Sequence, residues 1–361
     1  MTYMKHTTHK TERSQTIQLR NVILESLLIS ACLVGMAVPP APADAGPLPL
    51  TGVNISGGEW NIKPEKGTNY FFPTKAEIEY FAGQGMNVFR YPFRWETLQP
   101  ALRSPLNQPA LARLKESVRF ATSQKLTVIL DPHNSARYGT NIVGASAVSI
   151  ADFADFWAQL AAAFKDDPRV WFGLVNEPHN MSTKLWFETA NAAIAAIRAT
   201  GATNMILVPG NHWSGAHSWT GGGENSNAKW ALTVKDPLNH WALEVHQYVD
   251  GDSSGTKKVV VSPTIGAERL VKFVSWCRQN HLHALLGEFG VPVVPTGEEA
   301  LHTMLQSMER DSDVWLGWTW WAAGSRWGDY LFSIEPKVDG SERPQMAWLR
   351  PHLKGAGAPG K

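Results

Sequence analysis

The chain has 361 residues, of which 43% are hydrophobic and 18% charged, and its formal net charge is +1. This composition is typical of a globular protein that can bury a sizeable core. The balanced charge, without a long basic run, argues against a nucleic-acid-binding surface. The chain is also rich in tryptophan, with 16 copies, and these rings can fill a core or offer flat faces to a ligand.

The N-terminal segment has the pattern of an export signal. Basic residues precede a mainly apolar stretch at 22–38, and Ala43-Asp44-Ala45 gives a small-x-small cleavage sequence before Gly46. This order predicts that residues 1–45 are a signal peptide and that the protein is secreted to the periplasm or the medium. Because the apolar stretch approaches membrane-spanning length, a membrane anchor is the alternative.

Residues 46–353 are expected to form a single domain, because no Ser/Thr/Pro-rich linker interrupts them. Cleavage after Ala45 would leave Cys277 as the only cysteine, so stability would depend on the core rather than on an intramolecular disulfide. Cys277 lies in a helical pattern and is expected to be buried there. The Gly-, Ala- and Pro-rich end at 354–361 is predicted to be a flexible tail.

Short apolar segments alternate with longer amphipathic segments along this domain. Strands are predicted at 50–56, 87–91, 126–131, 170–175, 205–209, 241–246, 284–287 and 314–321. Helices are predicted at 75–84, 111–123, 150–164, 183–199, 225–234, 265–280 and 298–310, of which 225–234 has the weakest pattern. Eight strands with intervening helices predict an α/β fold, a (β/α)₈ TIM barrel. An open doubly wound sheet is the alternative, although no Gly-rich phosphate loop follows the first strand.

Two glutamates occupy the ends of predicted buried strands. Asn176-Glu177-Pro178 ends the apolar run at 170–175, and Glu288 follows the strand at 284–287. In a barrel, the carboxyl ends of all strands converge on one face, where active sites lie. Two carboxylates on separate strand ends are what acid–base and nucleophilic chemistry on a glycosidic bond requires.

The other predicted strands also end in polar or aromatic residues. These ends are Arg90, Asp131-Pro-His-Asn134, Asn211-His-Trp213, His246-Gln-Tyr248 and Trp320-Trp321. The repetition of this pattern around a barrel predicts one polar site lined by aromatic rings.

Two other kinds of chemistry compete for these residues. A metal could be held by His133, His246, Glu177 and Glu288, but none of them belongs to a closely spaced ligand pair, and no metal is predicted. Gly251-Asp-Ser-Ser-Gly255 matches the nucleophile elbow of serine hydrolases as a string. Because no helix pattern begins at its serine, we interpret this segment as a turn.

Taken in order, these motifs resemble glycoside hydrolase family 5, in particular its endo-β-1,4-glucanase (cellulase) branch. The resemblance extends from about Val53 to Pro336. Its landmarks are Gly85-Met-Asn-Val-Phe-Arg-Tyr-Pro92, Asp131-Pro-His-Asn134, Asn176-Glu-Pro178, Pro209-Gly-Asn211, Gly215-Ala-His-Ser-Trp219, His246-Gln-Tyr248, Gly287-Glu-Phe-Gly290, Trp320-Trp-Ala-Ala-Gly324, Gly328-Asp-Tyr330 and Ser333-Ile-Glu-Pro336.

The resemblance implies roles for the matching positions. Glu177 would be the proton donor and Glu288 the nucleophile of a retaining mechanism. Arg90 would keep Glu288 ionised, and Tyr248 would orient it. The remaining implied roles are hydrogen bonding of the sugar 2-hydroxyl by Asn176, support of the acid or sugar binding by His246, and substrate contact by His133. Structural alternatives are an ion-pair role for Arg90 and histidines that bond only to backbone.

The two glutamates need different protonation states at the same pH. We therefore expect the positive charge of Arg90 to lower the pKa of Glu288, and a neighbouring negative charge to raise the pKa of Glu177.

The implied substrate groove contains aromatic and amide side chains. Trp321 would form the platform beneath the sugar at the cleavage point, and Asn134 would contact substrate. Trp213, Trp219 and Trp327 would line the groove, with core packing as the alternative for each. The short loop near 180–182 favours an open cleft and cleavage within the polymer chain.

The resemblance implies that the partner is a β-1,4-glucan polysaccharide and that no cofactor is required. We expect a monomer that binds no nucleic acid and, after signal cleavage, no membrane. The same mechanism on mixed-linkage glucan, xyloglucan or mannan is the alternative function. A barrel that binds β-glucan without cleaving it is a more remote one.

Overall fold

The structure, a computed structural model, describes residues 46–60, 71–145 and 147–355. The predicted signal peptide, including its membrane-anchor alternative, and residues 356–361 of the predicted tail lie outside these ranges. Among the described residues, no helix combines the length and apolar character needed to span a bilayer.

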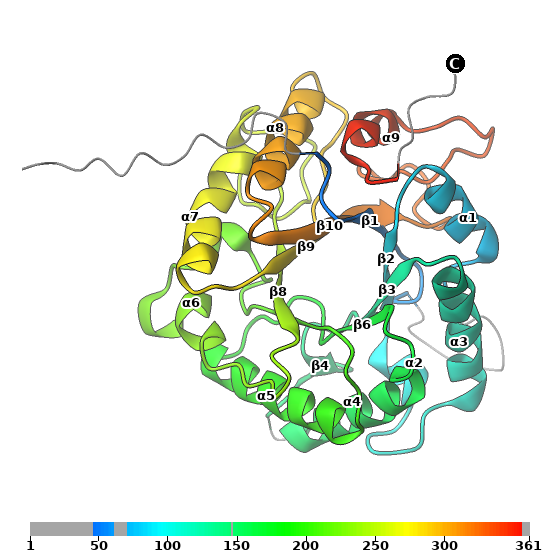
Figure 1. Cartoon of the computed structure of the whole chain (residues 1–361), viewed down its shortest axis with the longest axis vertical. Coiled ribbons are helices and arrows are strands. Elements are labelled where there is room, and N and C mark those ends of the chain that lie inside the picture. Colours follow the sequence, from blue (N-terminus) through cyan, green and yellow to red (C-terminus); the bar gives the residue numbers. More distant parts are fainter. Residues whose placement is uncertain (1–45, 61–70, 146, 356–361) are drawn as a thin grey trace, which may run out of the picture. The chain divides into compact units, whose positions relative to one another are not determined.

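Within the described residues, eight parallel strands close into a barrel surrounded by helices (Figure 1). The strands are β1 (Leu50–Ile55), β2 (Val88–Phe93), β3 (Thr127–Pro132), β6 (Val170–Gly173), β7 (Ile206–Pro209), β8 (Trp241–His246), β9 (Ala284–Glu288) and β10 (Trp315–Ala323). Because β1 pairs with both β2 and β10, the sheet has no open edge. This closure confirms the predicted (β/α)₈ barrel and excludes the doubly wound sheet.

Seven of the described helices correspond in order to the predicted ones, whereas the second and the last of those given next were not predicted. The helices are α1 (Lys75–Gly83), α2 (Trp95–Leu98), α3 (Gln108–Ser123), α4 (Ile150–Phe164), α5 (Thr183–Ala199), α6 (Asn227–Ala231), α7 (Ile265–Gln279), α8 (Gly297–Arg310) and α9 (Pro344–Leu349). The bounds of α4 and α5 are as predicted, whereas the helix predicted at 225–234 is only the short α6. Helix α3 begins three residues early because the side chain of Asn107 accepts a hydrogen bond from the Ala110 amide and caps it.

The smaller elements lie in the connections and were not predicted. They are the hairpin of β4 (Arg137–Tyr138) and β5 (Asn141–Ile142), and the 3₁₀ turns η1 (Ala216–Ser218), η2 (Gly223–Asn225) and η3 (Arg350–His352).

The interior of the barrel changes from apolar to polar along its axis. Five buried apolar residues from five strands pack together near one end: Val88, Ile129, Leu207, Ala242 and Leu285. Toward the carboxyl ends of the strands, the buried positions are polar: Asn54, Arg90, Asp131, Glu244 and Glu288. The apolar layer therefore supports a polar layer that faces the mouth of the barrel.

Gly287 in β9 makes room for one of these polar side chains. A Cβ atom at this position would lie 2.7 Å from both Cγ and Oε1 of Glu244 on the neighbouring strand β8. The absence of a side chain at Gly287 thus lets Glu244 turn into the barrel.

Two predictions outside the barrel can be compared with the structure. Cys277 is fully buried within α7, as expected, and burial raises the pKa of its thiol. The predicted tail begins too early, because the amide of Lys354 donates to Oγ1 of Thr51 and that of Gly355 donates to the carbonyl of Gly85. The chain is therefore still bound to the barrel at Gly355.

Candidate active site

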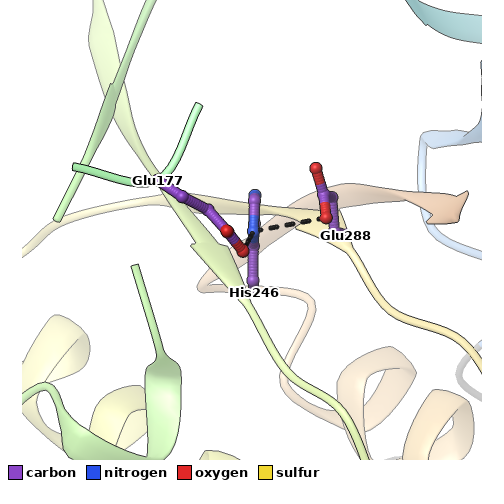
Figure 2. Close-up of side chains that lie close together, drawn as sticks. All are labelled: Glu177, His246 and Glu288. Carbon is purple, nitrogen blue, oxygen red and sulfur yellow. Dashed lines mark hydrogen bonds and ion pairs between the residues drawn. The ribbon is translucent and has the colours of Figure 1, made fainter. Parts of the chain in front are cut away.

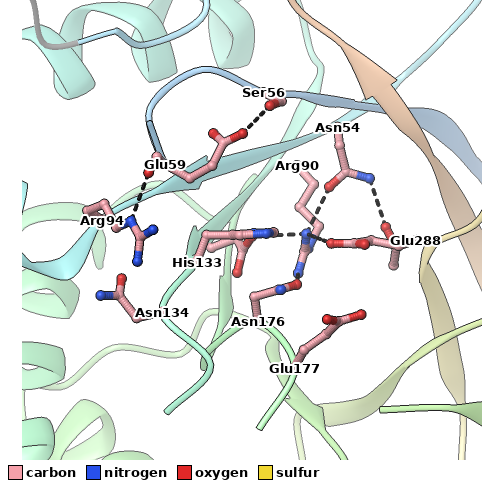
Figure 3. A network of polar contacts seen from close by, with 12 residues as sticks. Asn54, Ser56, Glu59, Arg90, Arg94, His133, Asn134, Asn176, Glu177 and Glu288 are labelled. Carbon is pink, nitrogen blue, oxygen red and sulfur yellow. Dashed lines mark hydrogen bonds and ion pairs between the residues drawn. The ribbon is translucent and has the colours of Figure 1, made fainter. Parts of the chain in front are cut away.

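Arg90 on β2 is the centre of the polar layer, and its side chain is fully buried (Figure 3). Its Nη1 lies 2.9 Å from Oδ2 of Asp131 and 3.0 Å from Oε1 of Glu288. Its Nη2 lies 2.8 Å from Oε1 of Glu244 and donates to Oδ1 of Asn176 over 2.9 Å. Burial lowers the pKa of Arg90, but the three carboxylates outweigh burial and raise it. A cation therefore joins the ends of β2, β3, β8 and β9.

Glu288 ends β9 and is held from two sides. Oε1 receives a hydrogen bond from Nη1 of Arg90, and Oε2 receives one from the hydroxyl of Tyr248, each over 3.0 Å. The residue is only 4% exposed. Burial raises the pKa of Glu288 above its ordinary value, although the positive charges of His246 and Arg90 act in the opposite direction.

Glu177 follows β6 with a left-handed backbone conformation, φ +44°, which is uncommon outside glycine and is found at active sites. Its Oε1 lies 2.7 Å from Nδ1 of His246 (Figure 2). The other ring nitrogen of His246 lies 3.4 Å from Oε1 of Glu244. With 22% of its side chain exposed, Glu177 is more accessible than Glu288.

The directions of the pKa shifts differ from those expected. Burial raises the pKa of Glu177, but the hydrogen bond and the charge of His246 outweigh burial and lower it. Burial lowers the pKa of His246, but the facing glutamates raise it to about 10. The expectation of a raised pKa for Glu177 and a lowered pKa for Glu288 is thus wrong. The proton of the Glu177–His246 pair therefore lies on the imidazole, because the buried carboxylates favour a cation there.

The two glutamates lie close together, with His246 beside them. A carboxylate oxygen of Glu177, Nδ1 of His246 and a carboxylate oxygen of Glu288 all lie within 4.8 Å of one another. Carboxyl groups of retaining glycosidases lie about 5–5.5 Å apart, and those of inverting enzymes about 6.5–9.5 Å apart. The nearest oxygens of the two glutamates lie close together, as the shorter, retaining spacing requires.

Asn176 and His133 flank the two glutamates. Because Oδ1 of Asn176 faces Arg90, its Nδ2 is the group left for a ligand. Nδ1 of His133 lies 2.8 Å from Oδ2 of Asp131, and its ring stacks on Trp321, with 5.2 Å between centroids and 15° between planes. Burial lowers the pKa of His133, but the carboxylate of Asp131 outweighs burial and raises it.

Aromatic rings continue the site on two sides. Trp321 meets Trp327 edge-on, and Trp327 stacks on Tyr330 with 4.2 Å between centroids. On the other side, Trp213 is 50% exposed and stacks on His179 with 4.7 Å between centroids. A cavity of about 790 Å³ extends from Glu177 and Tyr248 past Trp213. The groove beside Glu177 is therefore lined by the ring of Trp213, whereas Trp321, 7% exposed, packs with His133 and Trp327 on the other side.

Comparison with known proteins identifies the family. The sequence profile described as Cellulase (glycosyl hydrolase family 5) matches residues 43–324. The chain belongs to glycoside hydrolase family 5.

Relatives within family 5 match over most of their length. Endo-beta-1,4-glucanase A of Emericella nidulans is 36% identical over 338 residues, 92% of this chain and 100% of the relative. XacCel5A, solved in complex with cellopentaose, is 48% identical with a TM-score of 0.82, covering 84% of this chain and 99% of that one. The endoglucanase Cel5A of Pseudomonas stutzeri, solved in complex with cellobiose, is 36% identical with a TM-score of 0.78, covering 88% and 95%. The protein is thus a glycoside hydrolase of the cellulase type.

Two residues expected in the family 5 groove lie elsewhere. Trp219 is fully buried against Phe273 and Trp276, so its ring offers no face to a sugar. Asn134 is 3% exposed and uses both ends of its amide internally: Oδ1 accepts from the Trp95 amide and Nδ2 donates to Glu96. Trp219 therefore packs in the core. Asn134 holds the first turn of α2 through its bonds to Trp95 and Glu96.

Three residues of the site were not predicted from the sequence. Glu244 and Asn54 are buried within strands, and Trp60 follows β1 and meets Trp327 edge-on, with 4.6 Å between centroids. Glu244 precedes His246 by two residues, so strand periodicity places both on the same face of β8 and could have revealed it. Asn54 is the polar residue between Val53 and Ile55, and its Nδ2 donates to the carbonyl of Gly287 over 2.8 Å.

The family 5 site also contains a possible set of metal ligands. Glu177, His246 and Glu288 offer one nitrogen and two oxygens within 4.8 Å of one another, although the sequence showed no ligand-like spacing. One nitrogen and two carboxylate oxygens are a donor set that suits zinc. A cation bound there would occupy both glutamates needed for family 5 chemistry.

Proposed function

We propose that the protein is a secreted, retaining endo-β-1,4-glucanase that hydrolyses internal bonds of cellulose and related β-glucans. The observation that carries this proposal is the placement of Glu177 and Glu288, with oxygens within 4.8 Å of each other at one barrel mouth. The cavity beside Glu177, with the half-exposed ring of Trp213 in its wall, supports an extended sugar chain as the substrate.

In the first step, a carboxylate oxygen of Glu288 attacks the anomeric carbon, and the bond to the leaving glycosidic oxygen breaks. Glu177 gives its proton to that oxygen. Arg90 and Tyr248 hold Glu288 through separate oxygens. The two contacts fix the orientation of the carboxylate, and the guanidinium of Arg90 balances its negative charge. Nδ2 of Asn176 is placed to bond the sugar 2-hydroxyl as charge develops.

In the second step, Glu177 takes a proton from water while the water oxygen attacks the anomeric carbon, and the bond to Glu288 breaks. His246 supports both steps, because its Nδ1 lies 2.7 Å from Oε1 of Glu177. The proton held on the imidazole passes to Glu177 when the leaving glycosidic oxygen becomes its acceptor.

Two variants separate these roles. Glu288→Gln is expected to abolish turnover of carboxymethylcellulose, whereas Glu177→Gln lowers it by about 10²–10⁴-fold. On an aryl cellobioside whose phenolate leaves without protonation, Glu177→Gln should keep a rapid first release of the phenol. Glu298→Gln on α8, with its side chain 59% exposed, is the matched control. Near-normal activity of Glu288→Gln, or inversion of the first-formed anomer by proton NMR, would contradict the proposal.

The preferred β-glucan is tested by a reducing-sugar assay across cellulose, mixed-linkage glucan, xyloglucan and mannan. The proposal expects the highest rate on β-1,4-glucan. Tight binding of cello-oligosaccharides without hydrolysis would instead indicate a sugar-binding barrel.

We also propose that residues 1–45 direct export and are then removed. The mature protein would consist of the catalytic domain at 46–353 and its C-terminal tail, and it would be a monomer. The order of basic, apolar and small residues supports export. N-terminal sequencing of protein from the periplasm and the medium would test it, and retention of residues 22–38 would favour an anchor.

A further inference from the structure

Tyr248 is the residue through which the β8–α7 loop reaches the nucleophile. Its hydroxyl donates to Oε2 of Glu288 over 3.0 Å, the residue is only 7% exposed, and its ring stacks with Phe332, with 5.7 Å between centroids. The position of the hydroxyl therefore depends on what packs against the ring.

Gly255 is the loop residue in contact with that ring. It is the one buried residue of the run 251–259, and its backbone is left-handed, with φ +68°. A Cβ atom at Gly255 would lie 2.6 Å from Cδ1, 2.7 Å from Cε1 and 2.8 Å from Cγ of Tyr248. Because real Cβ atoms do not approach so closely, only glycine lets the loop backbone lie directly on the ring.

The loop is held in this position by a buried carboxylate and a guanidinium. Asp250 is 1% exposed, and its carboxylate accepts hydrogen bonds from the amides of Gly255, Thr256 and Lys257 and from the hydroxyl of Ser254. From α7, Nη1 of Arg269 donates to the carbonyls of Tyr248 and Asp250, each over 2.8 Å. These bonds fix the backbone on both sides of the Tyr248 ring contact.

The same loop forms part of the groove wall. Asp252, Ser253, Ser254 and Thr256 line the cavity beside Glu177 and Trp213. Gly255 therefore lies between groove-lining residues and the ring of Tyr248.

We propose that Gly255 is a positioning residue for the nucleophile: the loop locked by Asp250 and Arg269 seats the Tyr248 ring, and the ring sets the hydroxyl against Glu288. This inference rests on the proposed role of Glu288. A bound group that displaced the loop would also displace the Tyr248 ring. The position of the Glu288 carboxylate would then depend on what the groove holds.

A double-mutant cycle tests the inference. Gly255→Ala is expected to lower kcat on a soluble cello-oligosaccharide by ~10- to 100-fold, because small displacements of reacting groups have effects of this size. In the background of Tyr248→Phe, which has no hydroxyl to misplace, the same substitution should lower kcat by less than ~3-fold. Equal effects in both backgrounds would overturn the proposal.

Two glycine variants control for other effects. Gly201→Ala places alanine at φ +83°, where a Cβ meets nothing within 4 Å, and so reproduces the backbone strain without the collision. Gly251→Ala changes the same loop, and its Cβ also meets nothing within 4 Å. Both are expected to keep wild-type kcat. If Gly255→Ala does not fold, Arg269→Gln in the same cycle replaces it, since it releases the Tyr248 and Asp250 carbonyls.

The pH profile provides a second readout. The Tyr248 hydroxyl stabilises the ionised form of Glu288, so its displacement raises the pKa of Glu288 and moves the acid limb of kcat/KM to higher pH. Gly255→Ala should move this limb in the same direction as Tyr248→Phe, and an unmoved limb with lowered kcat would contradict the inference. If Tyr248→Phe itself has no effect, the role of Tyr248 fails and the inference about Gly255 fails with it, whereas the role of Glu288 is tested separately by Glu288→Gln.

Discussion

Nδ1 of His246 lies 2.7 Å from Oε1 of Glu177, and this contact joins the end of β8 to the loop after β6. It brings the groups that hold and deliver a proton into direct hydrogen-bonding distance. Because the facing carboxylates raise the pKa of His246 to about 10, the imidazole is a cation over most of the pH range of the folded protein.

This shift has a direct consequence for stability. His246 has a folded pKa above its ordinary 6.5, so its contribution is complete below about 6.5 and disappears as the pH rises through about 10. The unfolding temperature of the wild type should therefore fall between these values, and that of His246→Gln should fall less. Parallel curves for the two proteins across this range would contradict the assignment of the proton to His246.

Arg90 is expected to be essential for stability. Arg90→Lys keeps one charge but cannot reach all the oxygens that Nη1 and Nη2 contact, so buried carboxylates lose their partner. Loss of one partner from a buried ion pair costs about 3–5 kcal/mol. Urea denaturation measures this difference in the free energy of unfolding.

The control for Arg90 is a surface ion pair. Lys184 and Glu188 face each other one turn apart on α5, with their side chains about half exposed. Lys184→Ala should cost less than about 0.5 kcal/mol. A comparable loss in both variants would mean that the polar layer does not depend on Arg90.

Substitution by alanine is expected to affect stability at Trp219 and substrate binding at Trp213. Trp219→Ala removes a fully buried ring and should lower the free energy of unfolding by about 3–5 kcal/mol. Trp213→Ala removes a ring that is 50% exposed and should leave stability within about 0.5 kcal/mol, while raising KM for long oligosaccharides. Thermal unfolding and steady-state kinetics on both variants check this prediction. An unchanged KM for Trp213→Ala would mean that Trp213 does not contact the substrate.

Zinc ions are expected to inhibit the enzyme, and a chelator is expected to leave its activity unchanged. Zinc at Glu177, His246 and Glu288 would displace the proton and block both glutamates. Because ligands must lose their protons first, inhibition should strengthen as the pH rises. Initial rates at several zinc concentrations and two pH values test this, and inhibition unaffected by excess cello-oligosaccharide would place the zinc elsewhere.

The sequence predicted the parts of the site that lie at the ends of apolar strands. Glu177 and Glu288 interrupt hydrophobic runs, and a charge at such a position is visible without knowledge of the fold. The bounds of α4 and α5 were also predictable, because Ser149 and Ser182 cap well-defined amphipathic segments.

Other features depend on three-dimensional packing. Trp219 and Trp213 follow the same strand, and nothing in their local pattern distinguishes a ring packed against α7 from one in the groove. The pKa order of the glutamates depends on His246, whose contact with Glu177 requires the closed barrel. Gly255 was interpreted only as part of a turn, since its neighbour in space, Tyr248, is seven residues away.

The attachment of Lys354 and Gly355 to Thr51 and Gly85 determines where a tether can be placed. Both acceptors lie at or before the starts of β1 and β2, whereas the glutamates lie at the opposite mouth of the barrel. An enzyme immobilised on a bead through a linker joined at this point would therefore keep its groove open to the surrounding polymer.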